Sequence, residues 1–314
     1  MSSSSDPSFS APGSSDPGPH MMNPRLNLDS SVYVVPALTF LSCVAIMQYG
    51  NFCLTPASER SRQSFYLATI GISIHLVQIA LDLWYMCYSF QSYLTGQTKD
   101  PVIFLYTTLE VCTAVGIAVT VQYHYFRLVQ AMPALSKWWT VAIGFFAVAT
   151  CVGGLGTGAE FQVMGRTPPP TAGPPVISIV FLAFYNMWLI SNCLTDGTIS
   201  IAMILALRHS RSPIRHQSLA TTLRRLLFLT VSTFGLTFIV ALLSLIVPAL
   251  PHMIPSMSIR GQEICRVGSF VLNGILPRIY LNSFFCSLQC ARGTKSAKHD
   301  TKTITDSEPD YEKV

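Results

Sequence analysis

The residues of this chain best suited to chemistry are a few acids, bases and amides inside long apolar runs. Asp82 and Glu110 lie in neighbouring runs, about 12 and 10 Å from the outer ends at 1.5 Å per residue of helix. Two carboxylates that come close together repel each other unless they share a proton or bind a cation. The two residues therefore predict a proton or cation site.

Polar residues also follow a helical stripe through the run that contains Asp82. The spacing is i, i+3, i+7 and i+10, which places the side chains on one face of a helix. The stripe consists of His75, Gln78, Asp82 and Tyr85. A looser stripe in the next run consists of Thr107, Glu110, Thr113, Thr120 and His124. Such stripes either line a hydrated cavity or form hydrogen bonds between helices, and the sequence leaves both alternatives open.

Asp196 and Arg278 lie deeper, about 18 and 16 Å from the inner ends of their runs. A charge at the bilayer centre costs about 2.5–3.5 kcal/mol on insertion scales and is normally paired. Equal depth therefore predicts an ion pair between Asp196 and Arg278 that joins two helices. In the alternative interpretation, each side chain reaches water or the membrane surface separately.

Several activities find no support in the sequence. No Lys lies within an apolar run, so a retinal Schiff base has no nucleophile. The nine cysteines form no Cys-x-x-Cys pair and the histidines form no cluster, so we expect no metal and no cofactor. No hydrolase motif stands out, and we expect no enzymatic activity. Cys290 is a candidate for S-palmitoylation, and the GxxxG spacing of Gly154 and Gly158 predicts close helix packing.

The segments that must position these residues are strongly apolar. Half of the chain is hydrophobic and 11% is charged, whereas soluble domains have about 25% charged residues. Seven runs are long enough to cross a bilayer, which requires about 20 residues of helix. They are 32–54, 65–90, 103–128, 138–159, 177–207, 226–250 and 264–288. The sequence therefore predicts an all-α integral membrane seven-helix bundle over residues 31–291.

The charge distribution predicts the orientation of this bundle. With the N-terminus outside, most of the 20 Lys and Arg residues fall on the inner side. Basic residues are enriched in cytoplasmic loops, so we expect the N-terminus outside and the C-terminus in the cytoplasm. The positive charge then faces anionic lipid of the bilayer, and nucleic acid is not expected as a partner.

The segments that flank or connect the runs are polar. Residues 1–30 are rich in Ser and Pro, and residues 292–314 are basic and then acidic. We expect both to be disordered, the second in the cytoplasm. The inner loop from Arg208 to Arg225 carries five Arg residues. This loop and the C-terminal tail are the expected contacts for a cytoplasmic signalling partner.

Three motifs resemble those of a fungal, mainly basidiomycete, family of seven-helix membrane proteins of unknown function. The first is Leu-Thr-Asp-Gly-Thr-Ile-Ser at 194–200, and the second is Tyr-Leu-Asn-Ser at 280–283, followed by Leu288 and Arg292. The third is Val-Gln at 121–122, with Arg127 after it. The chain departs from the family at Gln289, where the family favours Asn. The resemblance implies seven helices, a cytoplasmic C-terminus, and Asp196 and Asn282 as motif residues, but no reaction.

Three functions remain open at this stage. A receptor-like sensor would bind a ligand and signal through the inner loop and the tail. A small-molecule or proton-coupled transporter would use Asp82, Glu110 and His75. A structural membrane protein would use its buried polar groups only to hold helices together. Either the plasma membrane or an endomembrane would be a suitable location.

Overall fold

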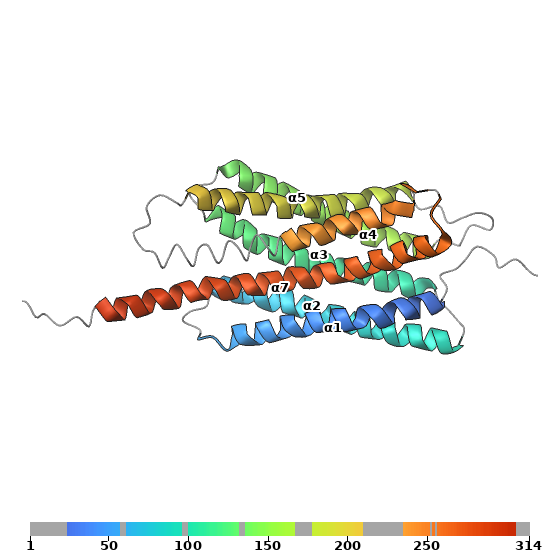
Figure 1. Ribbon diagram of the computed structural model, residues 1–314, viewed down its shortest axis with the longest axis horizontal. Helices are drawn as coiled ribbons and strands as arrows, with labels where there is room; N and C mark the ends of the chain where they lie inside the picture. The colour runs from blue at the N-terminus through green and yellow to red at the C-terminus, as the bar shows by residue number, and fades with distance from the viewer. Residues whose placement is uncertain are drawn as a thin grey trace, which may run out of the picture.

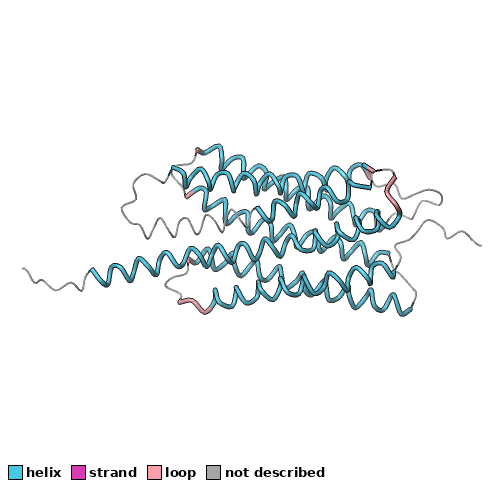
Figure 2. Tube along the Cα trace, in the orientation of Figure 1, coloured by secondary structure: helices cyan, strands magenta, loops and turns pink. Residues whose placement is uncertain are grey.

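The computed structural model of the chain describes residues 24–56, 61–95, 100–131, 136–166, 178–209, 235–251, 253–254 and 256–305. The regular elements in these residues are helices, and Figure 2 shows no strand among them. The long helices are α1 (Pro24–Cys53), α2 (Arg62–Thr95), α3 (Asp100–Gln130), α4 (Lys137–Arg166), α5 (Ile179–His209) and α7 (Ile259–Thr305). A shorter apolar helix, Gly235–Pro251, lies between α5 and α7 in the chain.

Six of the described helices are long and apolar enough to cross a membrane. Their apolar spans contain 19 to 31 residues, which matches the length that a bilayer requires. Large hydrophobic side chains cover the outside of the bundle, such as Phe40, Phe145 and Ile179, which are 68%, 67% and 85% exposed. An apolar exterior of this extent fits lipid rather than water. The all-helical class is confirmed, and the architecture is that of a multi-pass membrane protein.

The helices lie lengthwise beside one another (Figure 1). Helices α1 to α5 alternate in direction, and α7 runs in the same direction as α5 (Figure 1). Helix α4 packs between α3 and α5, whereas α1 packs against α2 and α7. Helix α7 also contacts α2 and α3, which in turn contact each other. Its C-terminal part projects beyond the ends of the other helices (Figure 1).

The core is densely packed where α7 meets α3. Four large side chains there are 0% exposed, namely Tyr125, Leu281, Phe284 and Phe285. Phe285 also packs against Tyr49 of α1, with ring centroids 5.9 Å apart. These aromatic contacts fix the position of α7 and therefore of the polar side chains that it carries.

Glycines on α4 allow close helix packing. A Cβ atom added at Gly153 would lie 2.6 Å from the backbone nitrogen of Trp188 on α5, so only glycine fits there. Gly154 and Gly158 lie against Val115 and Cys112 of α3, and Gly154 also lies near the Trp188 side chain. The close packing predicted from the GxxxG motif is confirmed, and a third glycine extends it to a second helix.

The ends of two helices differ from the sequence expectations. Helix α1 begins at Pro24 and α7 ends at Thr305, so both include residues assigned to the tails. Helix α5 runs without a break from Ile179 to His209. Of the expected sixth span, residues 226–234 lie outside the described part.

Candidate functional site

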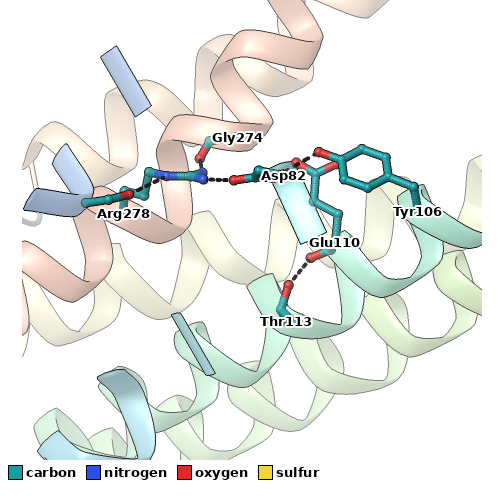
Figure 3. Close-up of polar contacts among 7 residues, drawn as sticks. Asp82, Tyr106, Glu110, Thr113, Gly274 and Arg278 are labelled. Carbon is teal, nitrogen blue, oxygen red and sulfur yellow. Dashed lines mark hydrogen bonds and ion pairs between the residues drawn. The ribbon is translucent and has the colours of Figure 1, made fainter. Parts of the chain in front are cut away.

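Arg278 is the centre of a polar cluster inside the bundle (Figure 3). It lies in the middle of α7, and only 1% of its side chain is exposed. Its guanidinium donates hydrogen bonds to the Asp82 carboxylate, to the Gly274 carbonyl and to Ser42 Oγ, the last at 3.3 Å. Three of its donor nitrogens therefore have partners on α1, α2 and α7. A buried guanidinium is tolerated only with this degree of compensation.

Asp82 is the counter-charge of Arg278, and it also links α2 to α3. One carboxylate oxygen forms the ion pair with Arg278. The other accepts a hydrogen bond of 3.0 Å from the Tyr106 hydroxyl on α3. The Asp82 side chain is 23% exposed, whereas that of Arg278 is 1% exposed. A ligand or a proton can therefore reach the ion pair only through Asp82.

The predicted ion pair between Asp196 and Arg278 is wrong. Arg278 pairs with Asp82, whereas Asp196 accepts a hydrogen bond from the hydroxyl of Tyr280. Residues two positions apart on a helix point about 200° away from each other. Arg278 and Tyr280 therefore face opposite sides of α7, and only Tyr280 faces α5.

Glu110 joins the cluster from α3, and its side chain points towards Asp82 in Figure 3. Its carboxylate interacts with the charges of Asp82 and Arg278, and the Tyr106 hydroxyl is a hydrogen-bond partner. Its Oε1 atom would lie 3.8 Å from a Cβ atom added at Gly274, so it reaches the surface of α7. The structure thus brings together the two carboxylates that the sequence singled out, together with one arginine.

His75 and Gln78 extend the cluster along α2. Both are 0% exposed, and His75 interacts electrostatically with Arg278. Apart from the contact between His75 and the Gln78 side chain, their side-chain nitrogen and oxygen atoms have no hydrogen-bond partner among the described residues. Buried polar groups without partners are rare in folded proteins because each one costs free energy. Unused hydrogen-bonding groups thus lie next to an ion pair.

The stripe on α3 behaves differently from the stripe on α2. Three of its members donate their hydroxyl protons to carbonyls of their own helix, namely Thr107, Thr113 and Thr120. In the described part of the chain, the hydrogen bonds of these three hydroxyls stay within α3. His124 packs edge-on against Phe284, with centroids 5.0 Å apart. Of this stripe, only Glu110 belongs to the cluster.

Asn282 holds α7 against α1. Its side-chain amide donates to the Leu41 carbonyl at 3.0 Å and to the Arg278 carbonyl at 2.9 Å. Asp196 lies apart from the cluster, is 0% exposed and faces Tyr280. The cluster therefore contains Asp82, Glu110, His75, Gln78 and Arg278, with Asn282 one turn away on α7.

Sequence reasoning missed Tyr106 and Ser42. Tyr106 lies four residues before Glu110, so helical spacing alone would have placed it on the same face. It also missed the amide pair of Gln122 and Asn192, which are 2.8 Å apart on α3 and α5. Nothing in the sequence pairs Gln122 with Asn192, because the two residues are 70 positions apart and lie on different helices.

Several predicted functional segments lie outside the described residues or side chains. They are residues 210–225 of the inner loop, the side chain of Cys290 and residues 306–314 of the C-terminal tail. Within the described part, no group of three or more His, Cys, Asp or Glu residues is placed to hold a metal ion. No protein-family model, curated protein or solved structure matches the chain.

Proposed function

We propose that this protein is a receptor-like membrane sensor in which the buried cluster controls the position of α7. The observation that supports this proposal is the place of the ion pair on that helix. Arg278 is held by Asp82 of α2, and α7 continues as one helix to Thr305, past the end of its apolar span at Gln289. The extension is about 24 Å long at 1.5 Å per residue.

Pro277 gives α7 a point at which it can bend. Proline has no backbone N–H, so the usual bond to the carbonyl of Asn273 cannot form. Arg278 follows directly, and its guanidinium donates to the Gly274 carbonyl in the same turn. A ligand or proton that competes for Asp82 would release Arg278 at this weak turn. The extension would then move as a rigid lever.

The proposal includes the arrangement that the sequence favours. It comprises seven helices with the N-terminus outside and the C-terminus in the cytoplasm, as in the fungal family that the motifs resemble. A cytoplasmic partner would read the movement through the α7 extension and the loop from Arg208 to Arg225. The cluster contributes no reaction in this proposal, and the protein is not an enzyme.

The test measures the movement of α7 directly. Spin labels are introduced through unnatural amino acids at Gln63 on α2 and Ser296 on α7, which leaves the nine native cysteines in place. We expect Asp82→Asn, and the milder Asp82→Glu, to change the distance distribution between the labels in reconstituted vesicles. Asp196→Asn is the matched control, because this acid faces the other side of α7. Distance distributions that are identical in the wild type and in all three variants would refute the sensor proposal.

A proton-coupled carrier is the second candidate, because Asp82 and Glu110 face one arginine. With both acids ionised, the cluster would carry one negative charge in excess, which a proton or cation would neutralise. Vesicles that contain the protein and a pH-sensitive dye would report proton uptake driven by a pH gradient. Uptake that Glu110→Gln abolishes would favour the carrier. Flux equal to that of empty vesicles would leave only the sensor or a structural role.

A further inference from the structure

A cleft of about 620 Å³ lies where α3 ends and α4 begins. It is separate from the buried cluster, and both polar and apolar residues line it. The polar lining residues are Arg127, Gln130, Lys137 and Thr140, and the apolar ones include Val141. Its volume is within the range of small-molecule sites, about 300–1,000 Å³.

The cleft carries two positive charges that lack partners among the described residues. Arg127 lies in the last turn of α3 and Lys137 is the first residue of α4. Both are exposed, and the ion pair of the described part is formed elsewhere, by Asp82 and Arg278. Arginine binds phosphate through two parallel hydrogen bonds, and lysine adds a second charge. The Gln130 amide and the Thr140 hydroxyl provide further donors.

The level of the cleft in the bundle identifies the source of the anion. The apolar span of α3 ends at Gln130 and that of α4 starts at Lys137, so the cleft lies at the ends of two apolar spans. In a bilayer, the ends of such spans meet the headgroup region. Trp138 is 78% exposed beside Lys137, as is typical of the membrane interface. Val141 is 59% exposed one turn further into the span. Side chains that can bind a phosphate thus lie next to an apolar surface that can contact an acyl chain. A phospholipid carries its phosphate and its acyl chains in the same order.

We propose that this cleft binds an anionic phospholipid through an exposed phosphate of its headgroup, as in phosphatidic acid or a phosphoinositide. Arg127 and Lys137 bind the phosphate, and Val141 contacts the start of an acyl chain. Basic pockets between membrane helices recognise such headgroups through the same combination of charge and depth. The site does not depend on the role of the Asp82–Arg278 pair.

The test titrates the purified full-length protein in neutral detergent with dioctanoyl phosphatidic acid, and counts bound lipid by native mass spectrometry. Dioctanoyl phosphatidylcholine and glycerol phosphate are the comparison ligands. We expect Arg127→Gln and Lys137→Gln each to weaken phosphatidic acid binding about fivefold. Arg62→Gln is the matched control, since Arg62 is an exposed arginine at the start of the α2 span and does not line the cleft.

Three outcomes would overturn the proposal. An equal loss in Arg62→Gln would mean that the protein attracts anionic lipid through its general surface charge. Phosphatidylcholine that binds as tightly as phosphatidic acid would exclude recognition of an exposed phosphate. Glycerol phosphate that binds as tightly as the lipid would identify a soluble phosphate as the ligand. Because Arg127 and Lys137 are exposed, melting temperatures equal to that of the wild type are expected and would separate lost binding from lost folding.

Discussion

The two faces of α7 hold their buried acids in different ways. On one face, Asp82 pairs with Arg278, and 23% of the acid's side chain is exposed. On the other, Asp196 is 0% exposed and is bound by the Tyr280 hydroxyl, with Thr237 as a second hydrogen-bond partner. The first contact joins opposite charges, so an incoming charge can break it. The second joins a carboxylate to neutral hydroxyls, which have no such competitor. We therefore expect the first face to switch and the second to stay fixed.

The largest expected effect comes from removing the counter-charge of Arg278. Asp82→Leu leaves a buried guanidinium unpaired and should lower the free energy of unfolding by about 3–5 kcal/mol. The double variant Asp82→Leu with Arg278→Met removes both charges and should recover most of this loss. Denaturant unfolding of the purified proteins in micelles measures both values. If the double variant were as unstable as the single one, the ion pair would not be the main contact on this face.

The second prediction concerns the fixed face. Tyr280→Phe removes the hydroxyl that donates to Asp196, and both residues are almost completely buried. Removing one partner of a buried hydrogen bond leaves the other unsatisfied and costs about 1–3 kcal/mol, so we expect a loss of about 2 kcal/mol. Tyr123→Phe serves as the control, because Tyr123 is 44% exposed. Equal stability of the two variants would show that the Tyr280 hydroxyl does not hold α5 against α7.

The sequence predicted which residues face inward, but it did not predict their partners. The stripe on α2 was correct because it depends only on the helical period, and His75 and Gln78 are indeed buried. The pair of Asp196 and Arg278 failed because equal depth does not fix the direction in which a side chain points. Asp196 meets Tyr280 instead. Tyr280 is two residues from Arg278, or about 3 Å along the axis, but faces the opposite side of α7.

The same reasoning explains what the sequence revealed of the fold. Long apolar runs predict helices in a membrane without reference to neighbours, because the bilayer sets their length. The contacts of α7 with α1, α2 and α3 depend instead on side chains such as Phe285 and Asn282, which meet partners more than 200 positions away. Pairings at this separation leave no local pattern in a single sequence.

A smaller effect should follow when Asp82 loses its second partner. Tyr106→Phe removes the hydroxyl that bonds Asp82 at 3.0 Å, while the bond to Arg278 remains. We expect a loss of about 1 kcal/mol, the typical contribution of one hydrogen bond. The α7 distance distribution in the spin-label experiment should stay close to that of the wild type. A change as large as in Asp82→Asn would mean that Tyr106, rather than Arg278, controls the position of Asp82.

The smallest effect is expected for Asp196→Asn, and it tests the comparison most directly. The amide oxygen still accepts the Tyr280 hydroxyl proton, and the amide nitrogen can donate to the hydroxyl of Thr237, which already hydrogen-bonds this side chain. No buried cation loses its counter-charge, because Arg278 pairs with Asp82. We therefore expect a change below about 1 kcal/mol in unfolding free energy, in the range of neutral hydrogen bonds. A loss equal to that of Asp82→Asn would require a charged partner for Asp196, and the two faces of α7 would then be alike.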